Sequence, residues 1–517
     1  MSESALLTPV VVGIAPSTGE DVVRVARHGA PVTIGDDALA AMAASRSRIE
    51  ALADDPVPVY GISTGFGALA TRHIPLELRT KLQRSLIRSH AAGSGPEVER
   101  EVIRAMMLLR LSTLTTGHTG VRPEVAQAYA GLLSSGLTPL VYEYGSLGCS
   151  GDLAPLAHVA LAVMGEGQVR TTDGEIVPAA DALRAHGIEP IVFAEKEGLA
   201  LINGTDGMLG QLILALADLD RLLVLADVAA AMSVEGLLGS DKVFAAHLHA
   251  LRPQPGQAVA AANMTRILAG SPIVASHSGP DCTLVQDAYS LRCAPQVAGA
   301  ARDTIAHARN VATWELASVV DNPVVTDDGV ESNGNFHGAP VAYVLDFLAI
   351  VVADVASISE RRTDRFLDAA RNHGLNAFLA DDPGVDSGHM IAQYTQAAIV
   401  SELKRLASPA SVDSIPSSAM QEDHVSMGWS AARKLRRAID GLTRVLAIEV
   451  LTAARGIDMR APLSPAAATG AVVAAVRERV EGPGADRYLA PEIDAVVQLA
   501  RDGSLVAAAE SVTGPLA

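Results

Sequence analysis

A chain of 517 residues is long enough to bury a large core, and its length alone allows about two to four domains. Apolar residues make up 49% of the chain and aromatic residues only 3%, a composition that favours closely packed helices over sheets. The formal charge of −18 argues against nucleic-acid binding, which needs a basic face. We therefore expect a mainly α protein with no nucleic-acid partner.

Cysteine and histidine spacing gives no sign of a disulfide framework or a metal site. Cys149, Cys282 and Cys293 are an odd number and form no CxxC pair. His247 and His249 are two histidines without a third ligand at a useful spacing. We expect a protein of a reducing compartment, the cytoplasm, with no bound metal.

Targeting and membrane signals are not expected either. The N-terminus has no basic region followed by an apolar run, so a signal peptide is not predicted. The long apolar stretch 341–356 carries Asp346 and Asp354, which argues against a membrane span.

Hydrophobic periodicity predicts an extended segment at 31–34 followed by a series of helices. The helices are expected at about 37–54, 82–92, 153–162, 208–232, 341–361 and 431–454. The helix 208–232 is apolar on most faces, so it must be buried in a bundle or between subunits, and we expect a homo-oligomer. The charged run 361–365 is interpreted as a solvated face.

The most informative stretch is Gly148-Cys149-Ser150-Gly151-Asp152. In a forced turn the Gly151 nitrogen can attack the Cys149 carbonyl, and Ser150 then loses water, which gives a five-membered ring with an exocyclic methylidene. Gly151 has no Cβ and so allows this close approach, whereas residue 149 lends only its carbonyl. Asp152 is placed to orient the peptide and to cap the helix 153–162, whose positive end would face the ring.

Two other interpretations of this stretch stay open on these residues alone. Runs of the type Gly-x-Ser-Gly are usually simple turns. A hydrolase nucleophile elbow needs glycine two residues after the serine, and Asp152 occupies that place.

The stretch resembles the cofactor-forming motif of the histidine and aromatic amino-acid ammonia-lyase family, which is usually Ala-Ser-Gly. The resemblance runs from about residue 30 to about residue 500 and includes at least five separated motifs in the family's order. It implies that Cys149, Ser150 and Gly151 form 4-methylideneimidazol-5-one (MIO) autocatalytically. It also implies a long-helix bundle of the fumarase/aspartase-like architecture, with a smaller N-terminal domain at 1–202 that carries the MIO loop and a helical bundle at 203–517.

The run from Tyr60 to Gly67 is similar to the family's Tyr-Gly-x-Asn-Thr-Gly-Phe-Gly loop, which implies that Tyr60 is the catalytic base. A lone tyrosine is more often a packed aromatic with a bonded hydroxyl. Ser63 stands where asparagine is commoner, which puts one local hydrogen bond in question. As a base Tyr60 needs a lowered pKa, and positive helix ends and Arg292 are expected to lower it.

Three further positions bear on the substrate by resemblance. Ser89-His90 is similar to the histidine-specific pair of the family, and Glu422 stands where histidine enzymes carry Glu and phenylalanine or tyrosine enzymes carry Gln. Both imply that His90 and Glu422 hold an imidazole. Asn203 would bind the substrate above the ring, although taken alone it is a good helix cap. Asp206 stands where Gln is usual.

The string from Gln286 to Cys293 nearly matches the family's Gln-Asp-x-Tyr-Ser-Leu-Arg-Cys. Gln286, Tyr289 and Arg292 lie three residues apart and share one face if the segment is helical. The resemblance implies a catalytic role for Tyr289, substrate binding by Gln286, and bidentate pairing of Arg292 with the substrate carboxylate. It also implies that Phe336 lines the active site.

The activity that the resemblance implies is the non-oxidative elimination of ammonia from L-histidine to give trans-urocanate, the first step of histidine degradation. A homotetramer with active sites shared among chains is implied as well. The alternatives are a phenylalanine or tyrosine ammonia-lyase or an MIO-dependent 2,3-aminomutase, which apolar residues at 89 and 90 or Gln at 422 would favour. A non-catalytic scaffold would be expected to lose Ser150, Tyr60 or Arg292. Met420, where Asn is common, leaves substrate choice more open.

Overall fold

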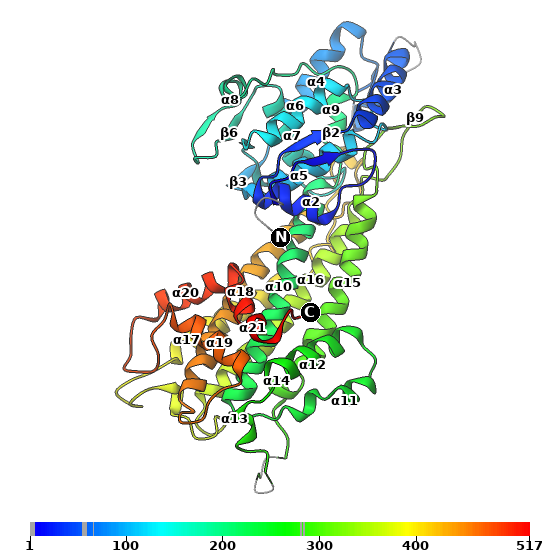
Figure 1. Cartoon of the computed structure of the whole chain (residues 1–517). Coiled ribbons are helices and arrows are strands. Elements are labelled where there is room, and N and C mark those ends of the chain that lie inside the picture. Colours follow the sequence, from blue (N-terminus) through cyan, green and yellow to red (C-terminus); the bar gives the residue numbers. More distant parts are fainter. Residues whose placement is uncertain (1–5, 54–58, 66, 280–281, 283–284) are drawn as a thin grey trace. The chain divides into compact units, whose positions relative to one another are not determined.

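The computed structural model describes residues 6–53, 59–65, 67–279, 282 and 285–517, and it is mostly helical (Figure 1). The chain forms two compact units. The first comprises 1–214, 309–346 and 409–433, and the second comprises 215–308, 347–408 and 434–517. The predicted domain boundary between residues 202 and 203 stays a prediction.

The first unit combines helices with short strands. Its helices are α2 (Gly19–Val23), the π-helix η1 (Arg24–His28), α3 (Asp36–Ala53), α4 (Leu76–His90), α5 (Arg100–Leu114), α6 (Pro123–Ser134), α7 (Leu153–Val163), α8 (Ala179–Ala185), α9 (Glu197–Ala200) and the one-turn helices η2 (Gly67–Leu69) and η5 (Ser418–Met420). Its strands are β1 (Val10–Val12), β2 (Val32–Ile34), β3 (Ser94–Glu97), β4 (Thr138–Pro139), β5 (Tyr142–Tyr144), β6 (Gln168–Arg170), β7 (Ile176–Pro178), β8 (Val324–Val325) and β9 (Val330–Glu331).

The strands form small separate sheets. β1 and β2 pair in parallel, with Val11 opposite Thr33. The pairs β3–β5 and β8–β9 and the three-stranded sheet β4–β6–β7 are antiparallel. Strands this short do not build a core, so the core of this unit lies among its helices.

The second unit is helical throughout its described regular segments. It contains η3 (Lys242–Phe244), α11 (Ala246–Ala250), α12 (Pro255–Ile267), α13 (Pro272–Ala275), α14 (Tyr289–Arg292), η4 (Ala377–Leu379), α17 (Met390–Leu406), α19 (Ala467–Arg477), α20 (Leu489–Arg501) and α21 (Ser504–Thr513). The long helices α10 (Asp206–Gly236), α15 (Ala294–Leu316), α16 (Ala339–Leu367) and α18 (Gly428–Asp458) contribute residues to both units.

The predicted elements agree with the structure in type, and their boundaries differ by up to six residues. The extended segment 31–34 is β2, and the predicted helices are α3, α4, α7, α10, α16 and α18. The predicted mainly α fold class is confirmed. α4 begins six residues before its predicted start at 82, because Pro75 at the N-cap sets the boundary.

Helix α5 is the centre of the first unit and is buried along nearly its whole length. It carries two arginines inside the protein. The Arg104 guanidinium donates to the carbonyls of Val25 (2.9 Å) and Leu133 (2.8 Å), and so joins η1 to the end of α6. Arg110 binds carbonyls beside the candidate site, as described below.

One helix in the described part of the chain, α16, passes a test of length and apolar composition for crossing a membrane. About 61% of its most apolar stretch is buried within the protein, as in the core helix of a globular protein. Its Asp346 is buried and accepts a hydrogen bond from the Ser411 amide at 2.7 Å.

The charged run at the end of α16 is not a solvated face throughout, so that prediction is wrong in part. Arg361 and Asp364 are exposed, but Arg362 is 2% exposed and pairs with the buried Glu449 at 2.5 and 2.8 Å. The same carboxylate accepts hydrogen bonds from Ser233 and Ser359. A charge pattern alone does not reveal a partner 87 residues away.

Removing one member of this pair tests its contribution. Arg362→Met leaves the Glu449 carboxylate buried without its cation, which lowers the free energy of unfolding by about 3–5 kcal/mol. The matched control is Asp364→Asn on the same helix, which breaks an exposed pair and changes stability by less than about 0.5 kcal/mol. Thermal and urea unfolding measure both, and equal effects would contradict the assignment.

Candidate active site

The Cys149-Ser150-Gly151 turn packs tightly against the backbone of a second segment, at Gly204. Gly151 has φ +78°, and a Cβ at this position would overlap the backbone of Gly204. The Asp152 amide donates to the Gly204 carbonyl at 2.7 Å. Only glycine combines this left-handed conformation with so close a backbone contact.

Serine hydroxyls and backbone amides hold the first half of the turn. Ser426 Oγ donates to the Gly148 carbonyl at 2.9 Å, and the Met427 amide donates to the Leu147 carbonyl at 2.9 Å. Ser146 Oγ accepts from the Gly148 amide at 3.2 Å. The segment that precedes α18 therefore fixes the carbonyl side of the turn.

Asp152 occupies the N-cap position of α7, but its side chain makes no capping hydrogen bond to that helix, so this part of the prediction is wrong. Its carboxylate is buried and accepts from the Met208 amide and from Ser146 Oγ, both at 2.8 Å. The Met208 amide is in the first turn of α10, so Asp152 caps α10 instead. Burial raises the pKa of Asp152 to about 7, although both hydrogen bonds act in the opposite direction.

Three helices begin next to the turn. α7 starts at Leu153, directly after it, and α10 starts two residues after Gly204, against which the turn packs. α18 starts at Gly428, whose neighbours hold the turn. Helix N-termini carry partial positive charge, so the turn lies in a field that stabilises negative charge on it.

A cavity of about 430 Å³ in the first unit opens at this turn. It brings together five of the residues that the sequence indicated: Tyr60, His90, Ser150, Asn203 and Glu422. Much of the remaining wall is apolar and is formed by Leu69, Ile74, Leu82, Leu86, Leu153 and Leu199. An apolar cavity with a few convergent polar groups is the usual form of a small-molecule site.

The Glu422 side chain is held beside Ser150 by two serine hydroxyls. Ser150 Oγ donates to Glu422 Oε1 at 3.1 Å, and Ser417 Oγ donates to Oε2 at 2.8 Å. The backbones of Ser417 and Glu422 also bond to each other. The buried Cys149 thiol has a pKa raised to about 12 by burial and by the Glu422 charge, so it stays protonated.

The ring of His90 is oriented by its own helix. Its Nδ1 lies 2.9 Å from the Leu86 carbonyl, and because a carbonyl only accepts, Nδ1 carries the hydrogen. Nε2 is then an acceptor. Burial lowers the pKa of His90, and the Leu86 bond and the Glu422 charge oppose the shift.

Tyr60 lies in an irregular turn, and its hydroxyl accepts from the Gly67 amide at 3.4 Å. The expected lowering of its pKa is wrong for the groups within this chain. Burial raises the pKa of Tyr60, the charges of Glu422 and Asp321 raise it further, and the Gly67 amide lowers it.

Asn203 does not cap α10 with its side chain. It is 4% exposed, and its Oδ1 is buried without a hydrogen-bond partner in the described structure. Its carbonyl accepts from Arg110 Nη1 at 3.1 Å. A buried amide oxygen without a donor, at the wall of a cavity, indicates a place where a bound molecule donates.

The departures from the family pattern have local explanations. Ser63 Oγ accepts from the Val59 amide at 2.9 Å, so a local hydrogen bond is made. Asp206 forms an ion pair with the buried Arg110 at 2.8 Å. Met420 is 67% exposed.

The second unit holds Gln286, Tyr289 and Arg292. The three side chains were expected to share one face only if the segment were helical, and this condition is not met, because α14 spans only Tyr289–Arg292 and Gln286 lies in the irregular segment before it. The Asp287 carboxylate accepts from the Ser240 amide at 2.7 Å, which fixes that segment outside the helix. The Arg292 guanidinium lies 4.8 Å from the centre of the Tyr289 ring, which is 72% exposed.

The other sequence predictions about sites have the following outcomes. Phe336 is half-buried in the turn before α16 and is not among the residues that line the cavity, so its role stays a prediction. His249 is buried, with Nε2 at the Val243 carbonyl and Nδ1 at the Gln257 amide. In the described part of the chain no three His, Cys, Asp or Glu side chains gather as metal ligands do.

Sequence reasoning missed the three serines that position the site, Ser146, Ser417 and Ser426. Each makes hydrogen bonds to the turn or to Glu422. Serine is common in loops, and nothing in its local pattern distinguishes these positions from solvent-exposed ones.

Comparison with known proteins gives a consistent result. The family model described as aromatic amino acid lyase matches residues 18–478. The histidine ammonia-lyase of Streptomyces avermitilis is 66% identical over 510 residues, which cover 98% of this chain and 99% of the relative.

Solved structures agree with this similarity. The histidine ammonia-lyase from Trypanosoma cruzi superposes with a TM-score of 0.89 at 38% identity, covering 98% of this chain and 96% of that one. The tyrosine aminomutase from Streptomyces globisporus has a TM-score of 0.93 at 37% identity, covering 99% and 100%. The fold is therefore shared by proteins named for different reactions.

The contact between Gly151 and Gly204 can be tested by adding one methyl group. Gly151→Ala combines left-handed strain with a backbone overlap, whereas Gly174→Ala has similar strain at φ +92° with no heavy atom near the new Cβ. The control loses about 1–2 kcal/mol of unfolding free energy, and Gly151→Ala loses about 1–3 kcal/mol more. Chemical unfolding measures the difference, and equal losses would show that the turn is not tightly packed.

Proposed function

The chain belongs to the aromatic amino acid lyase family, and from this premise we propose that it eliminates ammonia from L-histidine to give trans-urocanate. The 66% identity to a histidine ammonia-lyase over nearly the whole chain supports this proposal. The observation that carries it in the structure is the hydrogen bond from Ser150 to Glu422, made in a cavity that His90, Asn203 and Tyr60 also line.

The polar groups of the cavity suit an imidazole better than a phenyl or phenol ring. Glu422 offers carboxylate oxygens and His90 offers an Nε2 acceptor, in a cavity that leucine and isoleucine side chains also line. A carbocyclic ring offers no hydrogen-bond donor to these half-buried acceptors, which costs binding free energy. An imidazolium ring has two N–H donors that satisfy both acceptors.

We propose that MIO forms from Cys149, Ser150 and Gly151. The residues fit the group, because the Gly151–Gly204 contact leaves no room for a side chain and the unpaired Asn203 oxygen stands beside the turn. When formed, MIO supplies an electrophile that makes the substrate amine a better leaving group. Ser146 and Ser426 hold the surrounding backbone while the turn closes.

The remaining steps are assigned to side chains of this protein. Tyr60 takes the β-proton of the substrate, and Arg292 pairs with its carboxylate. Gln286 and Tyr289 complete the substrate contacts. Because the groups within the chain raise the pKa of Tyr60, positive charge from Arg292 or from the substrate must lower it in the assembled site.

We also propose a cytoplasmic homotetramer whose active sites combine residues of several chains. Exposed apolar side chains on one face of α16, at Tyr343, Phe347 and Ile350, support an association between copies. The exposed ring of Tyr289 accords with a role toward another chain.

A panel of substrates tests the proposed reaction. The purified protein is incubated separately with L-histidine, L-phenylalanine and L-tyrosine, and urocanate, cinnamate and coumarate are followed by ultraviolet absorbance. Urocanate forms from histidine alone, and Ser150→Ala abolishes it because the hydroxyl that must be lost is missing. Ser47→Ala, on the exposed side of α3, is the control with unchanged rate. Product from an aromatic substrate, or a β-amino acid, would favour the alternatives.

Substrate choice is tested at Glu422. Glu422→Gln removes a charged acceptor for the imidazole and lowers kcat/KM for L-histidine about a hundredfold, or ~2.7 kcal/mol. Asp423→Asn, at the exposed neighbouring position, leaves kcat/KM unchanged. Steady-state kinetics with both variants measure the difference. A fall of similar size in both variants would mean that Glu422 does not recognise the ring.

A further inference from the structure

Lys196 has an unusual environment for a lysine. Both its side chain and that of Asp321 are fully buried, and Nζ lies 2.5 Å from Asp321 Oδ2. Its backbone is left-handed, with φ +73°, at the N-terminus of α9. A buried charge and a left-handed non-glycine residue each cost free energy, and such features persist mainly where surrounding structure or function requires them.

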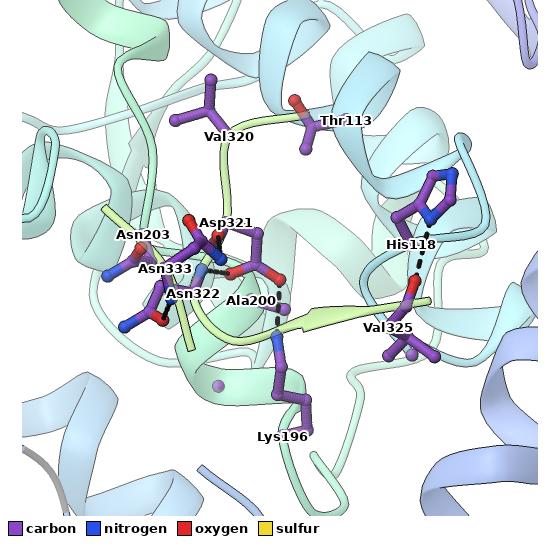
Figure 2. A network of polar contacts seen from close by, with 12 residues as sticks. Thr113, His118, Lys196, Ala200, Asn203, Val320, Asp321, Asn322, Val325 and Asn333 are labelled. Atoms are coloured by element: carbon purple, nitrogen blue, oxygen red, sulfur yellow. Dashed lines mark hydrogen bonds and ion pairs between the residues drawn. The ribbon is translucent and has the colours of Figure 1, made fainter. Parts of the chain in front are cut away.

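The partner of Lys196 belongs to a rigid turn (Figure 2). Asp321 Oδ1 accepts from the Asn322 amide at 2.8 Å, and the Asn333 side chain donates to the Asp321 carbonyl at 3.1 Å. Asn322 Oδ1 in turn accepts from the Asn333 amide at 2.8 Å. The carboxylate is therefore held in one position.

The same turn is attached to the rest of the first unit at both ends, and Figure 2 shows the attachment of Val325 to His118. On one side, Arg110 Nη2 donates to the Val320 carbonyl at 2.9 Å. On the other, the Val325 amide donates to the His118 carbonyl at 2.7 Å, and His118 Nδ1 donates to the Val325 carbonyl at 2.8 Å. These bonds hold the backbone on both sides of Asp321 in place.

This pair lies beneath the turn that carries Tyr60. A Cβ placed on Gly61 would lie 3.2 Å from Pro323 Cδ, 3.3 Å from Leu199 Cδ2 and 3.6 Å from Lys196 Cδ. The residue next to Tyr60 thus packs on the stem of Lys196 and on the proline that follows the Asp321 turn. A shift of either Lys196 or Asp321 would therefore displace the side chains on which the Tyr60 turn packs.

Charge connects the pair to Tyr60 as well. The Asp321 carboxylate raises the pKa of the Tyr60 phenol, and the ammonium of Lys196 opposes this effect because it neutralises that carboxylate. Glu422 also raises the pKa of Tyr60, and among the described residues His90 and Arg72 are further titratable groups that line the same cavity. Arg110 is a further cation close to Lys196.

We propose that Lys196 is a positioning residue for the Tyr60 base: its ion pair with Asp321 supports the Tyr60 turn and neutralises the carboxylate beneath it. This inference rests on the proposed function, in which Tyr60 removes the β-proton. Lys196 itself is fully buried and does not line the cavity, so it acts through other residues and not on the substrate directly.

The test compares opposite changes of charge. Lys196→Met removes the cation, so Tyr60 ionises at higher pH and the ascending limb of kcat/KM for L-histidine moves up by about 0.5–1.5 pH units. Asp321→Asn removes the anion and moves the limb down by a similar amount. The double variant returns the limb close to that of the unchanged protein. Tyr60→Phe has no such limb.

A matched control separates this role from plain destabilisation. Arg104→Met removes another buried cation of the first unit, whose hydrogen bonds go to Val25 and Leu133. It lowers the temperature of unfolding and leaves the pH limb in place. Should both Lys196→Met and Asp321→Asn behave like Arg104→Met, or shift the limb in the same direction, the proposed role is wrong.

A second measurement does not depend on turnover. Ultraviolet difference titration against Tyr60→Phe reports the pKa of the Tyr60 phenol, which rises in Lys196→Met and falls in Asp321→Asn. If the unchanged protein makes no urocanate but these shifts occur, the proposed reaction fails and the action of Lys196 on Tyr60 stands. If urocanate forms but the phenol does not shift, only the role of Lys196 is overturned. If Lys196→Met does not fold, the direction of the shift in the pKa of Tyr60 in Asp321→Asn decides the test by itself.

Discussion

The buried carboxylate of Asp152 is the interaction on which the candidate site depends. It accepts hydrogen bonds from the first turn of α10 and from Ser146, so it joins both ends of the glycine turn to a helix of the core. The Asp152 amide at the same time binds the Gly204 carbonyl. One residue therefore sets the distance between the turn and the segment that presents Asn203. The positions of Ser150 and Asn203 relative to each other follow from it.

The site also shows how buried charge organises backbone. Arg110 donates to the carbonyls of Ala200, Asn203 and Val320, and Asp206 neutralises it. Such a guanidinium satisfies several carbonyls that would otherwise be buried without donors. The segment before α10 and the Asp321 turn are thereby attached to the same side chain of α5. The geometry of the cavity wall depends on long-range polar contacts more than on local helix preference.

Much of the fold was predictable, because the patterns that determine it lie within short stretches of the sequence. The helices α3, α7 and α10 follow from apolar spacing, and the glycines of the Ser150 turn follow from backbone sterics. The partners of polar groups were not predictable. The Asp152 side chain caps α10 and not α7, and Arg362 pairs with Glu449 instead of facing solvent. Such contacts join residues far apart in the chain, so neither periodicity nor local motif contains them, and the site residues came from resemblance to a family.

The positions of the turn differ in which amino acids they tolerate, and this difference has a consequence for protein engineering. A side chain at 151 would overlap Gly204, and one at 204 would overlap Arg110 and Asp206, so both faces of the contact are closed to substitution. Cys149 needs neither a left-handed backbone nor a reactive side chain, since its thiol stays protonated. Residue 149 is therefore the position of this turn where neither backbone conformation nor side-chain chemistry demands one amino acid, and a variant library there should sample side chains that fit the buried space of Cys149.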